Sequence, residues 1–349
     1  MKIAVDAMGG DNAPQAVVAG AVQAAKEFGT GIILVGIEEL IQAELKKHHQ
    51  AKTLPIEVRK ATQVVDMLDS PATVFRRKKD SSIRVANELV KSGDAVAVIS
   101  AGHTGAAMAT SLFILGPLEG VERPAIATFM PTMKGTCIVL DVGANVDCKP
   151  HNLEQFAIMG EIYARAILGR QRPRVGVLSI GEEESKGNEL TRAAHALLKR
   201  LPLNFVGNVE GRDLYNGKMD VIVCDGFVGN VALKISEGLV NTVSYLLKES
   251  LKATISSQVG FLLSRRAFAD FKKRLDYSEY GGAPLLGVKG ACIVSHGSSN
   301  SNAIKNAVRV AAEFATANLN QKIEAGIAET RNGSRNGEFV AAAAASPEI

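Results

Sequence analysis

The sequence predicts a three-layer α/β/α fold of the Rossmann-like kind, in which helices cover both faces of a mostly parallel sheet. Short apolar runs alternate with segments of helical spacing over most of the 349 residues, and such alternation is typical of βαβ units. Aromatic residues make up 5% of the chain and Trp is absent, so small aliphatic residues must build the core. We therefore expect a single α/β/α catalytic domain over residues 1–330.

Eight short apolar runs are predicted to be buried strands, and helical spacing fills most of the intervals between them. The runs lie at residues 2–7, 31–36, 55–60, 94–100, 174–180, 203–208, 219–225 and 291–296. Residues 124–143 differ, because two β-like runs flank a short Pro/Gly turn. That pattern predicts an antiparallel hairpin.

Two segments near the C-terminus depart from the alternation. Residues 236–280 are predicted to form protruding helices, which would serve as a dimer or membrane tip. Residues 331–349 have low complexity, which predicts a disordered tail.

Composition excludes several classes of protein. The net charge of +4 is too small to indicate a nucleic-acid-binding protein. No apolar stretch is long enough for a signal peptide or a membrane-spanning helix, so we expect a cytoplasmic protein. The cysteines form no CxxC pair and mostly lie in or beside apolar runs, which predicts buried reduced thiols rather than a metal site or disulfides. They are Cys137, Cys148, Cys224 and Cys292.

Glycine and small polar residues follow six of the predicted strands. These loops are DAMGGDNAP, SAGHTGA, DVGANVD, SIGEEESKGNE, CDGFVGN and SHGSSNSN. Ligands of open α/β sheets bind at such strand ends, and the amides of a helix N-terminus favour an anion. The phosphate motifs GxxxxGK[ST] and GxGxxG are absent, as are HExxH and GxSxG, so we expect no nucleotide, metal or other cofactor.

An ordered set of blocks resembles the PlsX family of bacterial phosphate acyltransferases over roughly residues 1–320. The blocks are MKIAVDAMGGDNAP, RRKKDSS, SAGHTGA, DVGANVDCKP, GEEESKGNEL, DGFVGNVALK, YGGAPLLG and HGSSNSNAIKNA. The turn departs from the family, where Asn more often stands in place of His103, and the tail is not a family feature.

The resemblance implies a substrate, a product and partners. A long-chain acyl group would pass from acyl carrier protein to inorganic phosphate, and the acyl phosphate would feed a membrane acyltransferase in phospholipid synthesis. The fold would resemble the isocitrate and isopropylmalate dehydrogenases and phosphotransacetylase, and the protein would be a homodimer.

This chemistry needs an anion-binding site more than a covalent nucleophile. Phosphate is already an anion, so the enzyme must position the reactants and stabilise the tetrahedral oxyanion. Lys186, Asn145 and Asp147 are the candidate catalytic residues. The alternative for Lys186 is an exposed loop lysine beside three glutamates, and the alternative for the other two is turn capping.

Further small and polar residues are expected to bind phosphate or substrate; for Ser100, Thr104, Gly105, Asp225 and Asn230 the alternative is helix capping. They are Gly9, Gly10, Ser100, Gly102, His103, Thr104, Gly105, Asp225, Gly226, Asn230, His296 and Ser298. We expect His103 to donate a hydrogen bond rather than to act as an essential base. Asp6 and Asp11 would repel phosphate, so they are expected to orient other groups or to bind a cation.

The helical stretch after Asn230 combines apolar residues at i, i+4 spacing with a basic cluster. Leu247, Leu251, Ile255 and Val259 form one stripe, and Phe268, Phe271 and Leu275 form another. The stretch predicts packing on a dimer partner and a peripheral contact with an anionic membrane or with acidic acyl carrier protein, and these roles can coexist on different parts of the stretch. The contact residues would be Val259, Leu263, Arg265, Arg266, Lys272 and Lys273; RRKK at 76–79 is a second candidate for docking the carrier protein.

Two rival functions remain at this point. An NAD-dependent hydroxy-acid dehydrogenase could use the same fold, although the nucleotide fingerprint is missing. A non-enzymatic membrane scaffold would explain the basic helix but not six polar strand ends.

Overall fold

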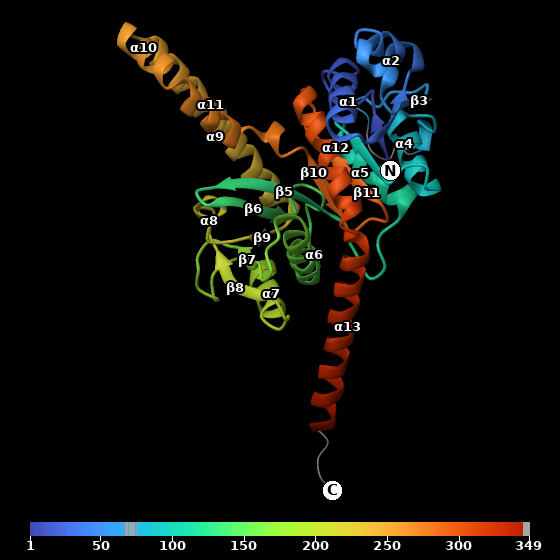
Figure 1. Ribbon diagram of the computed structural model, residues 1–349. Coiled ribbons are helices and arrows are strands. Elements are labelled where there is room, and N and C mark those ends of the chain that lie inside the picture. Colours follow the sequence, from blue (N-terminus) through green and yellow to red (C-terminus); the bar gives the residue numbers. More distant parts are fainter. Residues whose placement is uncertain (67–68, 70–73, 75, 345–349) are drawn as a thin grey trace.

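Eleven strands form one sheet in the computed structural model, which describes residues 1–66, 69, 74 and 76–344 (Figure 1). The strand order is β3-β2-β1-β4-β11-β10-β5-β6-β9-β7-β8. Their bounds are β1 Lys2–Asp6, β2 Gly31–Gly36, β3 Ile56–Lys60, β4 Ala97–Ser100, β5 Ala125–Thr132, β6 Gly135–Leu140, β7 Arg174–Leu178, β8 Asn204–Val209, β9 Val221–Val223, β10 Ala283–Leu286 and β11 Ala291–Val294. All eight strands predicted from apolar runs are confirmed.

Two parallel halves make up this sheet. Strands β3, β2, β1, β4 and β11 run parallel to one another, as do β6, β9, β7 and β8. The antiparallel hairpin of β5 and β6 is confirmed, and β10 is antiparallel to both of its neighbours. Strand β10 was not expected, because its run of four residues is short and contains Pro284, which cannot donate to the ladder.

Helices cover both faces of the sheet, which confirms the three-layer architecture. On β1 the side chains alternate: Ile3 and Val5 join one buried cluster, and Ala4 joins the cluster on the other face. The first cluster includes residues of α1, α2, α6, α7, α12 and α13, and the second includes residues of α4, α5 and α8. These helices are α1 Gln15–Phe28, α2 Glu38–Leu45, α4 Ser82–Ser92, α5 Thr104–Leu115, α6 Pro150–Leu168, α7 Glu189–Leu198, α8 Asp213–Asn216, α12 Ser301–Thr316 and α13 Leu319–Ala344; short 3-10 turns are η1 His49–Thr53 and η2 Tyr277–Glu279.

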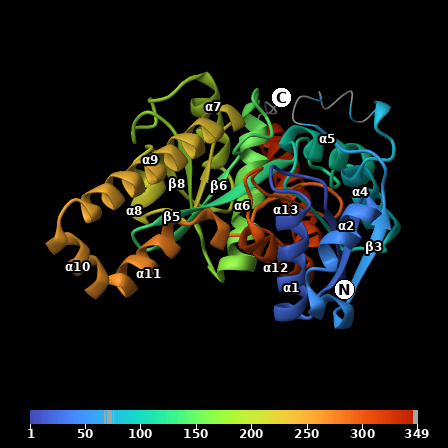
Figure 2. The same ribbon diagram turned by 90° about the horizontal axis from the view of Figure 1, so that it is seen from above.

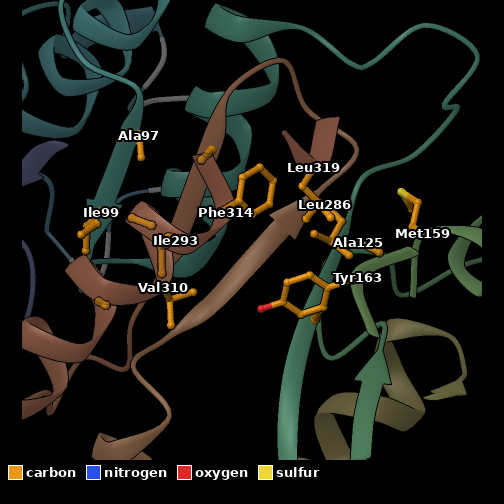
Figure 3. Close-up of a cluster of buried hydrophobic side chains, with 14 of the residues drawn as sticks. Ala97, Ile99, Ala125, Met159, Tyr163, Leu286, Ile293, Val310, Phe314 and Leu319 are labelled. Atoms are coloured by element: carbon orange, nitrogen blue, oxygen red, sulfur yellow. The ribbon is translucent and has the colours of Figure 1, made fainter. Parts of the chain in front are cut away.

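The core is continuous across the centre of the sheet, where the two halves meet (Figure 3). Ile99 of β4, Ile293 of β11 and Leu286 of β10 lie side by side under Phe314 of α12 and Tyr163 of α6. All five are at most 2% exposed. This packing fixes the strand ends that carry the predicted site.

Three helices project from the body as an arm, defined here as residues 226–275. Helix α9 (Gly226–Lys252) leads outward, α10 (Ile255–Leu263) forms the tip, and α11 (Arg265–Leu275) returns beside α9 (Figures 1 and 2). The apolar stripe predicted from Leu247 to Val259 is therefore not continuous. Thr254 interrupts it, because its Oγ1 accepts from Ser257 N at 3.1 Å and starts a new helix.

The C-terminal helix extends beyond the predicted domain end. Leu319, Ile323 and Ile327 of α13 are buried in the first core cluster. The helix continues to Ala344, whereas the composition predicts a disordered tail from residue 331. Its Ala-rich end has high helix propensity, and residues 345–349 lie outside the described part.

The cysteines mostly occupy the core, as expected. Cys137, Cys224 and Cys292 are buried, Cys148 is half-buried, and none of the four forms a disulfide. Burial raises the pKa of the Cys137 thiol to about 12. These side chains behave as small apolar residues.

Candidate active site

A cleft of about 550 Å³ opens where the two halves of the sheet separate. Strands β10 and β5 pair only through Leu285 with Ile126 and Leu286 with Ala125. Beyond these pairs β5 continues beside β6, while the start of β10 stays with β11. The volume falls in the range of small-molecule binding sites.

The cleft has a polar end and an apolar wall. Its polar end comes from the loops after β4, β6 and β11 and from the first turns of α9, and its apolar wall comes from β5, α9 and the end of α11. The lining residues are Thr104, Gly105, Ile126, Thr128, Phe129, Met130, Pro131, Val142, Gly143, Tyr215, Asn230, Leu233, Lys234, Ser236, Glu237, Val240, Asn241, Leu275, Tyr280, Gly282, Ala283, Val294, Ser295, His296 and Ser298. Five predicted residues are among them: Thr104, Gly105, Asn230, His296 and Ser298.

Three of the six predicted loops meet at one edge of the sheet. A Cβ atom on Gly9 would lie 2.8 Å from the amide nitrogen of Gly102, so the loops after β1 and β4 are in contact. The Asp11 amide, next to Gly10, donates to Gly297 O at 2.8 Å, which joins the loop after β11. The parallel order of β1, β4 and β11 explains this convergence.

Ser100 uses its hydroxyl to hold these loops in place. Its hydroxyl donates to Asp6 Oδ2 at 2.7 Å and accepts from the Gly102 amide at 3.2 Å. Burial raises the pKa of the Asp6 carboxyl, and the serine donor partly offsets that rise. Ser100 and Asp6 line a separate small cavity with Gly9, Gly102 and His103. Asp6 thus orients a neighbouring group, as expected.

His103 caps helix α5. Its Nδ1 accepts from the Ala106 amide at 3.2 Å, which requires Nδ1 to be unprotonated. The capping alternative considered for this loop is therefore what the geometry shows. The next residues, Thr104 and Gly105, open onto the cleft, so the positive end of the α5 dipole faces it.

Asp141 organises the loop after β6. Its carboxylate accepts from the amides of Ile126, Gly143, Ala144 and Asn145 at 2.7–3.2 Å. Burial raises the pKa of this carboxyl, against the effect of those donors. The sequence analysis did not single out Asp141; its position directly after an apolar strand and before Gly143 is the signal that could have done so.

The structure does not bring Asn145 or Asp147 to the cleft. The Asn145 amide nitrogen donates to Pro124 O at 2.7 Å and to Asp141 Oδ2 at 2.9 Å, and the residue is buried. Asp147 is exposed and is not among the lining residues. Turn formation accounts for both residue types here.

The start of α9 carries one cleft residue and two structural ones. Asp225 is the N-cap, with its Oδ1 accepting from the Val228 amide at 2.9 Å, and the Gly226 amide donates to Asn145 O at 2.7 Å. One turn farther on, Asn230 faces the cleft beside Gly143.

Lys234 and Ser295 are cleft residues that the sequence analysis missed. Lys234 follows Asn230 by four residues and so lies on the same helix face, which is the signal that could have found it. Its Nζ lies 3.1 Å from His296 Nε2, and His296 Nδ1 lies 2.7 Å from Ser298 Oγ. The Ser298 amide donates to the same Nδ1 at 3.2 Å.

Lys186 lies outside the cleft. It is exposed in the loop between β7 and α7, where its amide donates to Glu183 O at 3.0 Å. Because β6, β9 and β7 are parallel neighbours, this loop shares an edge with Gly143 but is two strand spacings away, about 10 Å.

The predicted contact residues lie on α10 and α11 of the arm. Val259 is 52% exposed and Leu263 is 82% exposed. Arg265, Arg266, Lys272 and Lys273 are exposed on α11. Of the second candidate, Arg76 and Arg77 are exposed, and Lys78 pairs with Asp69; residues 70–73 and 75 lie outside the described part.

The described residues offer neither a metal site nor a membrane-spanning helix. No group of three or more His, Cys, Asp or Glu side chains is placed to hold a metal ion there. None of the described helices combines the length and apolar character needed to cross a bilayer.

Comparison with known proteins identifies close relatives. A family model described as fatty acid synthesis protein matches residues 1–322. A phosphate acyltransferase of Koribacter versatilis is 62% identical over 332 residues, which cover 93% of this chain and 92% of that protein. One of Geobacter sulfurreducens is 55% identical over 323 residues, which cover 93% of each.

Solved structures show the same fold at low sequence identity. A phosphotransacetylase from Streptococcus pyogenes superposes with a TM-score of 0.61 at 18% identity and covers 90% of this chain and 94% of its own. A branched-chain phosphotransacylase from Enterococcus faecalis gives a TM-score of 0.54 at 15% identity over 90% of this chain and 99% of its own. The expected likeness to the phosphotransacetylase fold is confirmed.

Proposed function

The chain belongs to the fatty acid synthesis protein family, and from that premise we propose that it transfers a fatty acyl group from acyl carrier protein to inorganic phosphate. Its curated relatives are named phosphate acyltransferases, and the chain is an acyltransferase. The product would be an acyl phosphate, which a membrane acyltransferase would consume in phospholipid synthesis.

The observation that carries this proposal is the two-sided character of the cleft. Thr104 and Gly105 place a helix N-terminus at the polar end, which favours an anion. The wall opposite is formed by residues such as Phe129, Leu233 and Val240, which suit an alkyl chain. From Asn230 to Asn241 the lining follows α9 for about 16 Å, three turns of helix. The cleft therefore suits a reactant with a charged head and a long apolar tail.

The proposed reaction needs no covalent intermediate with the enzyme. A phosphate oxygen attacks the thioester carbonyl, a P–O–C bond forms, the C–S bond breaks, and the sulfur leaves as a thiolate. A thiol with a pKa of about 8.5 is a good leaving group near neutral pH. Asn230, which lines the cleft, would donate to the developing oxyanion, and we propose that Lys186 approaches from the neighbouring loop when substrates bind.

The arm fits the remaining expectations. On α9 the exposed residues Val231, Ile235, Leu239 and Leu246 follow one another at spacings of four, four and seven and would form the interface of a homodimer. At the tip, exposed apolar residues of α10 lie next to the cations of α11, which would hold the protein peripherally at an anionic membrane. The same cations would attract an acidic carrier protein.

The proposal is tested by incubating the purified protein with acyl-acyl carrier protein, with and without inorganic phosphate. We expect release of the carrier thiol only when phosphate is present, together with an acyl phosphate that hydroxylamine traps. Omitting nucleotide and nicotinamide cofactors should not reduce the rate. Thiol release at the same rate without phosphate, or no release with any chain length, would refute the proposed function.

A further inference from the structure

We propose that Lys234 and Ser295 form the phosphate subsite of the cleft. This inference rests on the proposed function and names the residues that recognise its smaller substrate. Neither residue belongs to the set that the sequence pointed to.

Lys234 supplies the positive charge. Among the described residues that line the cleft it is the one lysine or arginine. Its Nζ lies 2.8 Å from Glu237 Oε2 and 3.1 Å from His296 Nε2. An ammonium group has three donors, so the ion pair with Glu237 leaves donors for a ligand.

Ser295 supplies a hydroxyl that lacks a partner in the described part of the structure. The residue is 4% exposed, and its buried Oγ makes no hydrogen bond to any described group. Leaving such a group unpaired costs free energy. The residue lines the cleft together with Gly282, and a Cβ on Gly282 would come within 2.8 Å of that oxygen. A phosphate oxygen bound in the cleft would satisfy it.

The N-terminus of α5 completes the subsite. This helix has 12 residues, and its first residues, Thr104 and Gly105, line the same cleft. His103 occupies one of the four unpaired amides, that of Ala106. The remaining amides, the hydroxyl and the ammonium then offer three kinds of donor to one tetrahedral anion, which is the donor set that phosphate prefers.

Glu237 has a positioning role in this arrangement. Its carboxylate lies one turn beyond Lys234 on α9 and pairs with it, so the ammonium is held in place before phosphate arrives. The ion pair also keeps the unoccupied subsite close to neutral.

The test measures phosphate affinity in two ways on Lys234→Gln, Ser295→Ala and the matched control Lys248→Gln, which alters an exposed lysine farther along the same helix. The first readout is the KM for phosphate at saturating acyl donor. The second is binding of inorganic phosphate alone, followed by calorimetry or by phosphorus NMR, which needs no turnover.

We expect Lys234→Gln to weaken phosphate binding about ten- to hundredfold, as loss of a charge-assisted hydrogen bond does, and Ser295→Ala to weaken it several-fold. The KM for the acyl donor should stay the same in both, and Lys248→Gln should match the parent. Lys234→Arg, which keeps the charge, should recover part of the affinity.

Parent-like phosphate binding in both Lys234→Gln and Ser295→Ala would overturn the subsite. Failure of the proposed function looks different, because the parent would then transfer no acyl group to phosphate. The binding readout decides the subsite in that case too, since phosphate would either bind and depend on the two residues or not bind there at all.

Discussion

His103 illustrates how one residue can look catalytic and serve as a cap. Its Nδ1 accepts the Ala106 amide, and Asn is a strong N-cap residue. We expect His103→Asn to keep most of the acyl transfer activity, whereas loss of a general base costs on the order of 10²–10⁴-fold. His103→Leu cannot accept that hydrogen bond and should lower the free energy of unfolding by about 1 kcal/mol. Steady-state kinetics measure the activity of His103→Asn, and urea unfolding measures the stability of His103→Leu. A hundredfold loss of activity in folded His103→Asn would show that His103 acts as a general base.

Lys186 presents the reverse case. Its positive charge suits the reaction, but the residue lies outside the cleft. If it reaches the oxyanion from the shared sheet edge, as we propose, Lys186→Ala should lower turnover roughly 10²–10³-fold. Lys218→Ala, at another exposed loop lysine, serves as the control in the same turnover assay. Equal rates for the two variants would make Lys186 an ordinary exposed loop residue.

At the scale of the element, α9 depends on one close approach to the loop after β6. A Cβ on Gly229 would lie 1.8 Å from Asp141 O, whereas one on Gly238 of the same helix would meet nothing within 4 Å. Gly229→Ala must push the first turn of α9 away from the cleft, and we expect it to lower the free energy of unfolding by about 3 kcal/mol. Gly238→Ala should raise it by about 0.5–1 kcal/mol through helix propensity. Denaturant unfolding midpoints that shift alike in the two variants would contradict this account.

The sequence predicted elements better than it predicted the site, for physical reasons. Apolar runs of six or seven residues identify buried strands, and among the described strands β10 escaped that rule, because it has four residues and contains Pro284. The loops were harder, because N-caps and anion sites use the same residue types. Asp225 and His103 cap helices, while the Asn230 side chain faces the cleft. Sequence spacing alone does not separate these cases.

The direction of the strands was the second obstacle. The hairpin of β5 and β6 was predicted, but the reversal of strand direction that it causes, and hence the positions of the later loops, were not. The hairpin reverses the second half of the sheet, so the six polar strand ends fall into two groups of three, and the cleft is lined by residues from both groups. Lys186 belongs to the group that shares an edge with Asn145, and Ser100 to the other.

At the scale of the whole molecule, the arm would separate the proposed membrane contact from catalysis. Leu263 is 82% exposed at the tip, next to cations that are each worth about 1 kcal/mol near an anionic surface. Leu263→Glu should abolish sedimentation with anionic phospholipid vesicles and leave acyl transfer in solution intact. Parent binding should also weaken with salt, since screening is strong beyond about 10 Å at 0.1 M.

Val206→Glu provides the matched control, because Val206 is 51% exposed and belongs to the edge strand β8, outside the arm. This variant should sediment with vesicles as the parent does. If Leu263→Glu also sediments like the parent, α10 does not contact the membrane.

The strand order has a consequence for biosynthesis. Ala97 of β4 pairs with Ile3 on one side and with Ala291 on the other. The strands between β4 and β5 are β11 and β10, which residues 283–294 form. The ribosome makes these residues after the strands on both sides of them. Until then β4 and β5 present bare edges, which attract other unfinished chains. A polypeptide that stops before residue 283 keeps both edges, and we expect premature termination to yield aggregates rather than a smaller folded protein.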